Sequence, residues 1–386
     1  MAANDNNRKA ENGDYVVAGI DMSDLFPAPF PSDAKTVELE TLSLAKLFAF
    51  DKAELGRIYK NCQNPGFFQL DLTDDERGVE LLQDAVECAR LMKKLLPYMS
   101  VAEKETYKQR GRVGVYSMGY KTYDVLPNGQ PKYTETVNFP MTEMLGYGDD
   151  SVLQLPGWLS PHVEQFRRTM RHGNKIANIV FATLETGLKL PAGSITQAHR
   201  IEDLSDDFLR LLRYPGLDPS QPRDDLRFPA HKDFSSLGIL FTWLGGLQLP
   251  ATVDTRLDDD GPMTGPLDIS EDAWRYVKPI PGTAILNIGL MLEILTNNAL
   301  TAGLHRVVRA PGLQAPYDRY SVLIGTRAAN DFPMKPFKSC VISPVLDPAI
   351  ADIAKMTSGE WGSQKIGAFN DWVKERETKR EVLVLP

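Results

Sequence analysis

Two side chains able to bind a metal stand two residues apart at the start of an apolar run. They are His231 and Asp233, in the stretch HKDFSSLGILF. In a β-strand, residues i and i+2 project to the same face, so an imidazole nitrogen and a carboxylate oxygen would point toward one place. In a chain with five histidines this pair alone is an ordinary coincidence. A metal site therefore requires a third ligand.

His305 is the histidine best placed to complete such a site. It lies in LHRVVRAP, a strand-like run 74 residues after His231. The remaining histidines, His162, His172 and His199, lie in charged helical or loop contexts, which a solvated helix face explains. Two histidines and one carboxylate leave three positions open on one face of an octahedral metal, which is the arrangement that iron(II) oxygenases require.

A candidate anion clamp follows in the run RYSVLIG. Arg319 and Ser321 are again two residues apart, so on a strand their side chains point together. The planar fork of Arg and the Ser hydroxyl suit the distal carboxylate of a dicarboxylic acid. The alternative for Arg319 is a surface ion pair with Asp318. The clamp is favoured because a candidate metal triad accompanies it.

The composition limits the kind of protein that carries these residues. With 386 residues, 42% of them hydrophobic, the chain can bury one large core or two moderate ones. Its formal charge of -8 gives no basic field, so we expect neither nucleic acid nor a membrane as partner. Three scattered cysteines indicate a reducing compartment, and we expect a cytoplasmic protein.

The elements that must position the site change in type along the chain. The first half is mainly helical, with helices expected over 52–61, 74–96 and about 161–188 and a Gly/Tyr-rich loop from Arg110 to Pro140. From Phe208 onward, six or more short apolar runs are separated by Gly, Pro or Asp, which predicts an antiparallel sandwich or jelly roll. The acidic stretch 253–272 is expected to be an exposed spacer, with a lid as the alternative.

Taken together, these segments resemble a known family. HKD, HRVVRAP and RYS, in this order, are similar to the iron(II) and 2-oxoglutarate-dependent dioxygenases of the isopenicillin N synthase-like family. GIDMSDL and GFFQL resemble the N-terminal part of that family, and GGLQL, WRYV and PGTAILNIG resemble its core. The similarity extends from Val17 to Arg327 and covers most of the chain.

The resemblance implies an α+β fold with a mainly β core. The core would be a double-stranded β-helix of jelly-roll or cupin-like type, flanked by helices from the N-terminal half. The implied organisation is a disordered leader at 1–14, a helical region at 15–195, the catalytic core at 196–335, and a C-terminal extension at 336–386 with a helix packed on the core.

The resemblance also implies roles for individual residues. Iron(II) would be held by His231, Asp233 and His305, and the C5 carboxylate of 2-oxoglutarate by Arg319 and Ser321, with Tyr214 helping to hold this cosubstrate. Two positions depart from the family pattern: Leu212 replaces a frequent Asn, and Leu290 replaces the usual acid after NIG. The interval from His305 to Arg319 and the acidic loop are also longer than usual.

The implied reaction uses O2 and 2-oxoglutarate to hydroxylate, desaturate, close or expand a ring in a small molecule of specialised metabolism. Candidate substrate contacts are Phe234, Tyr120 and Arg327, with core packing as the alternative for the two aromatics; Arg327 would suit a substrate carboxylate. The sequence leaves the oligomeric state open. Three other functions also remain open: an oxidase of this fold without 2-oxoglutarate, a non-catalytic jelly-roll binding module, and a zinc hydrolase.

Overall fold

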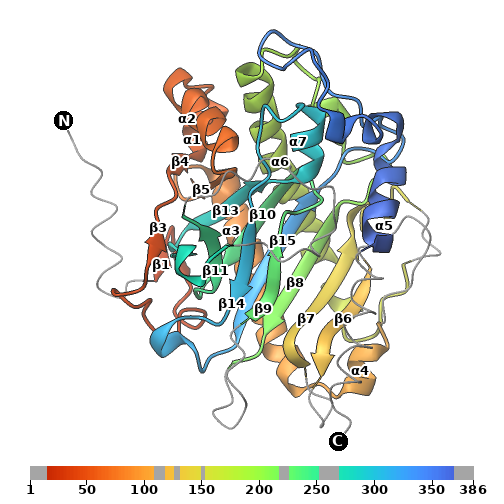
Figure 1. Cartoon of the computed structure of the whole chain (residues 1–386). Helices are drawn as coiled ribbons and strands as arrows, with labels where there is room; N and C mark the ends of the chain where they lie inside the picture. The colour runs from red at the N-terminus through yellow and green to blue at the C-terminus, as the bar shows by residue number, and fades with distance from the viewer. Residues whose placement is uncertain are drawn as a thin grey trace, which may run out of the picture.

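The strands form three sheets, of eight, five and two members. The structure is a computed structural model that describes residues 15–107, 118–125, 131–148, 153–216, 226–251 and 269–368. In this part of the chain the two-stranded sheet is the hairpin of β1 (Val16–Val17) and β2 (Ile20–Asp21). The expected leader at 1–14 and nearly all of the expected acidic loop lie outside the described residues. The molecule is thus a mixed α/β fold with large sheets (Figure 1).

The eight-stranded sheet combines strands from both halves of the chain. Its order is β4 (Thr41–Ser43), β5 (Phe67–Asp71), β13 (Thr283–Ile288), β10 (Leu237–Thr242), β15 (Arg319–Thr326), β8 (Phe208–Tyr214), β7 (Pro131–Pro140) and β6 (Gly119–Val125). Strands β5, β13, β10, β15, β8, β7 and β6 pair antiparallel, as predicted for the second half, whereas β4 joins β5 in parallel.

The prediction of a loop from Arg110 to Pro140 is wrong for β6 and β7, which extend the large sheet in the second part of this range. Strand β7 has polar residues on both faces, so its sequence does not alternate between apolar and polar residues. On one face Thr134 and Thr136 line a cavity, and on the other the buried Glu135 accepts hydrogen bonds from Lys104 and Arg213. An ion-paired acid on the core face breaks the apolar period by which strands are found in sequence.

The smaller sheet faces the large one. It has the order β3 (Thr36–Val37), β12 (Trp274–Val277), β11 (Leu247–Pro250), β14 (His305–Val308) and β9 (Leu226–His231). Apolar side chains from both sheets pack between them, including Leu212 and Leu323 of the large sheet and Phe228 and Val307 of the small one. The space between the sheets is therefore partly core and partly cavity.

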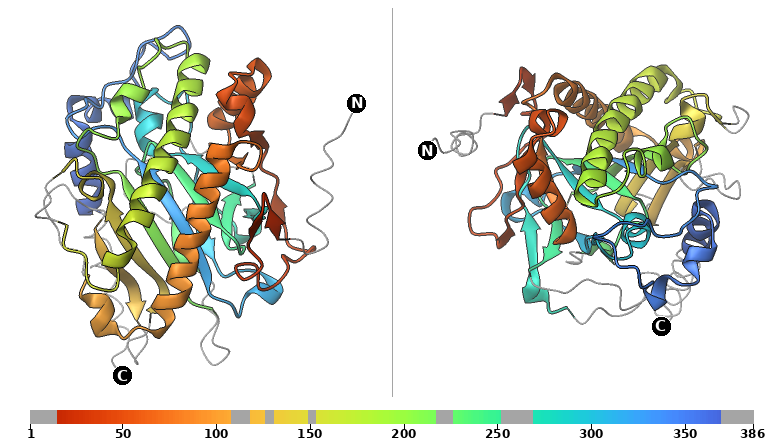
Figure 2. Two further views of the ribbon diagram at one scale, coloured as in Figure 1. Left: turned by 180° about the vertical axis from the view of Figure 1, so that it is seen from behind. Right: turned by 90° about the horizontal axis from the view of Figure 1, so that it is seen from above.

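Helices cover the other face of the large sheet (Figure 2). The main ones are α2 (Lys52–Gln63), α3 (Glu76–Leu95) and α6 (Val163–Gly187), close to the predicted ranges. Asp51 and Asp75 accept backbone N–H bonds at the starts of α2 and α3, as N-caps do. Gly173 lets α6 approach β15 closely, because a Cβ there would lie 2.4 Å from Ile324.

The remaining helices are short. They are α1 (Leu44–Phe48), α4 (Val101–Glu105), α5 (Met141–Met144) and α7 (Leu290–Leu295), and residues 358–368 are also helical. Trp361 of this last segment is buried in one cluster with Met291 and Leu295 of α7. None of the helices in the described ranges has the length and hydropathy needed to cross a membrane.

Candidate metal centre

His231 and His305 stand side by side at the ends of neighbouring strands. His231 is the last residue of β9 and His305 the first of β14, and the two are direct partners in the antiparallel register. Their ring centres are 4.1 Å apart. The pairing of two strands far apart in sequence thus brings the two imidazoles together, as the sequence predicted.

Asp233 joins the two histidines from a turn that follows β9, and not from the strand itself. Its carboxylate Oδ1 lies 3.5 Å from Nε2 of His231 and 4.0 Å from Nε2 of His305. One ligand atom from each of the three residues lies within 4.8 Å of the others, close enough to share a metal ion. The backbone of the turn is fixed to α7, since Leu290 N–H donates to the Asp233 carbonyl at 2.8 Å.

The hydrogen bonds of the two histidines suit metal binding. Nδ1 of His231 donates to the Pro229 carbonyl at 2.9 Å and Nδ1 of His305 to the Gly303 carbonyl at 3.1 Å, so both Nε2 lone pairs remain for a metal. Burial, and then the nearby His231, lower the pKa of His305 to about 4, so this ring is neutral at pH 7.

The carboxylate of Asp233 is ionised. Burial acts to raise its pKa, but the neighbouring His305 and His231 and a hydrogen bond from Asn287 outweigh burial and hold the pKa below its usual range. Two neutral imidazoles and one carboxylate are the donor set of a facial iron(II) site. The three residues fit the ion that the sequence suggested.

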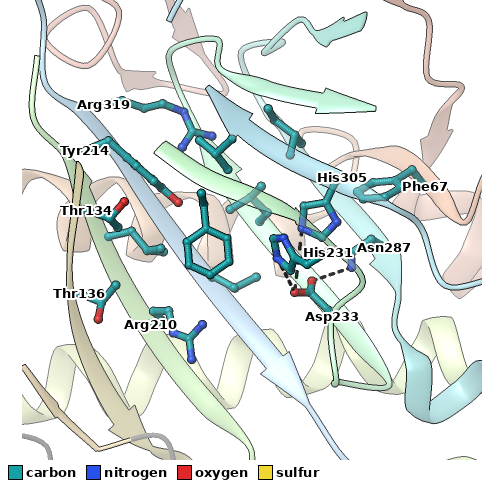
Figure 3. Close-up of a pocket in the computed structure, with 16 residues that line it drawn as sticks. Phe67, Thr134, Thr136, Arg210, Tyr214, His231, Asp233, Asn287, His305 and Arg319 are labelled. Carbon is teal, nitrogen blue, oxygen red and sulfur yellow. Dashed lines mark hydrogen bonds and ion pairs between the residues drawn. The ribbon is translucent and has the colours of Figure 1, made fainter. Parts of the chain in front are cut away.

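Asn287 is a contact that the sequence analysis missed. It lies on β13, in the PGTAILNIG run, and its Nδ2 donates to Oδ2 of Asp233 at 2.8 Å (Figure 3). This bond occupies one carboxylate oxygen and turns the other toward the histidines. Asn287 therefore orients the Asp233 carboxylate in the way that residues behind a metal ligand do.

Replacing Asn287 should weaken metal binding without removing a ligand. For Asn287→Ala we expect iron(II) affinity to fall about 10- to 100-fold, as is usual when the partner of a ligand is lost. Anaerobic iron(II) titration measures this change. The control is Asn61→Ala, which removes a buried amide on α2 that bonds to Glu40. Equal iron affinity in the two variants would contradict the orienting role.

Arg319 and Tyr214 form a second polar region of the same cavity. They are register partners on β15 and β8, and the Arg319 guanidinium carbon lies 4.8 Å from the centre of the Tyr214 ring. Arg319 Nε donates to the Leu244 carbonyl at 3.3 Å. Burial lowers the pKa of the Arg319 guanidinium, which indicates a cation held in an apolar place.

Two polar side-chain atoms of β15 are buried without a protein partner in the described ranges. They are Nη1 of Arg319 and Oγ of Ser321. Both residues are almost fully buried, and unpaired buried donors cost about 1–3 kcal/mol each. Arg319 lines the cavity, so a carboxylate bound there would accept a hydrogen bond from Nη1, which fits the end of a dicarboxylic acid; Ser321 is not among the described lining residues.

One cavity between the two sheets connects these regions (Figure 3). It holds about 690 Å3 of space, part of which is open to solvent. Its walls are apolar apart from the groups described and a few polar side chains from β7 and β8. The described lining residues are Phe67, Thr134, Thr136, Arg210, Leu212, Tyr214, Phe228, His231, Asp233, Leu240, Leu247, Asn287, His305, Val307, Arg319 and Leu323.

The three expected substrate contacts do not line this cavity. Phe234 packs edge to face on Trp361, with ring centres 6.3 Å apart. Tyr120 is buried and donates its hydroxyl to Glu135 at 2.8 Å. Arg327 is buried beyond the end of β15, where its backbone N–H bonds to Asp207. The core-packing alternative therefore describes both aromatics, and other residues face the space available to a substrate.

Comparison with known proteins places the chain in one family. Residues 205–324 match the 2OG-Fe(II) oxygenase superfamily. A 2-oxoglutarate-dependent dioxygenase of Aspergillus fumigatus is 72% identical over 386 residues, the full length of both chains. Another from Gibberella zeae is 26% identical, over 78% of this chain and 83% of its own. The crystal structure of a Neurospora crassa protein in complex with α-ketoglutarate and thymine has a TM-score of 0.64 at 16% identity, over 88% of this chain and 98% of its own.

The chain belongs to the 2OG-Fe(II) oxygenase superfamily, as the resemblance implied. It is an oxidoreductase of the 2-oxoglutarate-dependent dioxygenase class, whose reactions require Fe(II), 2-oxoglutarate and O2. This result excludes the binding-module and zinc-hydrolase alternatives.

Proposed function

We propose that the cavity is the active site, with His231, Asp233 and His305 as the iron(II) ligands. The observation that carries this assignment is the convergence of two imidazoles and one carboxylate within 4.8 Å. In the same proposal Arg319 and Ser321 bind the C5 carboxylate of 2-oxoglutarate, and Tyr214 flanks it. Support comes from the unpaired buried donors of Arg319 and Ser321. The two facing sheets would then be the halves of a distorted double-stranded β-helix.

In this proposal the protein residues control position and charge. Bound iron(II) supplies the coupling of 2-oxoglutarate and O2 to oxidation of a substrate C–H bond. With iron(II) bound by one carboxylate and two neutral imidazoles, the centre would keep a net positive charge, which favours an anionic cosubstrate. Arg319 adds a second cation at the far end of the dicarboxylate. The mostly apolar walls lower the local dielectric constant and so strengthen both electrostatic contacts.

The substrate is proposed to be a small molecule of specialised metabolism. The cavity lies between the two sheets, and its mostly apolar lining with a few convergent polar groups is typical of small-molecule sites. The net charge of -8 disfavours a polyanionic substrate. Hydroxylation, desaturation and ring closure or expansion all fit such a site, because the outcome depends on which carbon is held near the metal.

The test is an anaerobic titration followed by product analysis. Purified protein loaded with iron(II) should develop a metal-to-ligand charge-transfer absorption when 2-oxoglutarate is added. On admission of O2 and a panel of small molecules, succinate should form in equal amount to the oxidised product. An oxidase that does not use 2-oxoglutarate would give product without succinate, and that result would overturn the proposed function.

A further inference from the structure

The cavity contains a second guanidinium group, and the proposed site for 2-oxoglutarate does not use it. The described lining has two arginines, Arg210 and Arg319. Arg210 lies on the cavity face of β8, because Arg210, Leu212 and Tyr214 alternate along this strand and all three line the cavity.

Arg210 and Arg319 project from well-separated positions along the strands. In the register of β8 and β15, Arg319 is level with Tyr214, whereas Arg210 is level with Leu323. Four residues of strand separate the two levels, which corresponds to about 13 Å. Figure 3 accordingly places Arg319 beside Tyr214 and Arg210 beyond Thr136, with the His231, Asp233 and His305 group to one side of both. The cavity thus has a cation at each of two separate places.

The Arg210 side chain is positioned by a defined hydrogen-bond network. Its Nε donates to Oδ1 of Asn138 at 2.6 Å. The Asn138 amide is itself oriented, since its Nδ2 donates to the Gly119 carbonyl at 3.2 Å and to Oγ1 of Thr136 at 3.1 Å. The guanidinium also lies over the Phe208 ring, at 4.5 Å. Such pre-organisation lowers the entropy lost when an anion binds.

We propose that Arg210 is a substrate-recognition residue and that the substrate carries a carboxylate. Arg210 would hold this group while the oxidised carbon lies near the metal, and 2-oxoglutarate occupies the Arg319 end. The inference rests on the proposed function, because it assumes that Arg319 is taken by the cosubstrate. A planar guanidinium binds a carboxylate through two parallel hydrogen bonds, which a neutral amide cannot reproduce.

Matched acids and amides test this inference on the full-length protein. The probes are hexanoate with hexanamide and 3-phenylpropanoate with 3-phenylpropanamide, titrated calorimetrically into anaerobic protein with saturating iron(II) and 2-oxoglutarate. In the wild type each acid should bind at least about 10-fold more tightly than its amide, as expected for a charged hydrogen-bond pair. In Arg210→Met this preference should fall to near unity, and Arg210→Lys should keep part of it.

Two controls separate this inference from the proposed function. Arg200→Met, an exposed arginine outside the cavity lining, should keep the full preference for acids. The charge-transfer absorption with 2-oxoglutarate should be unchanged in Arg210→Met. Equal binding of acid and amide by the wild type, or an unaltered preference in Arg210→Met, would overturn the role of Arg210 while the absorption persists. Absence of the absorption in the wild type would instead reject the proposed function.

Discussion

His231→Ala should lower iron-dependent formation of succinate by at least about 100-fold, and Asp233→Ala and His305→Ala should do the same. Each change removes one of three ligand atoms that lie within 4.8 Å of one another. Two remaining ligands cannot hold the metal in the facial arrangement that leaves cosubstrate and O2 their positions. The measurement is succinate release at saturating 2-oxoglutarate, with iron bound to the protein determined in parallel.

The matched control for this experiment is His162→Ala. His162 is a half-buried histidine whose ring contacts Phe166 at the start of α6. It belongs to the helical layer, so its loss should leave turnover near the wild-type level. Circular dichroism of the metal-free variants should match the wild type. Wild-type turnover in His231→Ala would reject the ligand assignment, whatever the other two variants showed.

The site could be predicted from sequence where its geometry follows from strand periodicity. The spacing of Arg319 and Ser321 predicts that they share one face of one strand; both lie on β15, and Arg319 lines the cavity, while their joint role as a clamp stays a prediction. The approach of His305 to His231 needed one further assumption, that two strand-like runs 74 residues apart are neighbours. The family resemblance supplied that assumption, because periodicity within one strand does not specify its partner.

Other contacts could not be predicted, because they depend on how separate elements meet. Asn287 faces Asp233 through the pairing of β13 with β10, and its side chain stands in a run that is otherwise apolar. Arg210 could have been found by counting back from Tyr214 in steps of two. Phe234 follows Asp233 directly, yet the turn after β9 directs its ring toward Trp361, a residue of the C-terminal segment. Being next to Asp233 in sequence therefore did not place Phe234 in the cavity lining.

Arg319→Met should raise the KM for 2-oxoglutarate about 10- to 100-fold, with a smaller effect on kcat. The expected change in KM follows from the net free energy that a hydrogen bond to a charged group contributes to binding, about 1.5–3 kcal/mol. Arg319 is buried and leaves Nη1 without a partner in the described part of the protein, so the cosubstrate would supply the missing acceptor. Steady-state kinetics with 2-oxoglutarate as the varied substrate measure the change.

Conservative variants make this result specific to the clamp. Arg319→Lys keeps the positive charge but loses the planar pair of N–H donors that binds both carboxylate oxygens. Its KM for 2-oxoglutarate should therefore lie between those of the wild type and Arg319→Met. Ser321→Ala removes one buried hydroxyl and should raise the KM only a few-fold. Arg275→Met, on β12 of the small sheet, should leave the KM unchanged. If the KM for 2-oxoglutarate stays at the wild-type value in folded Arg319→Met and Arg319→Lys, the cosubstrate carboxylate binds elsewhere, and Arg210 becomes the cation to test for that role.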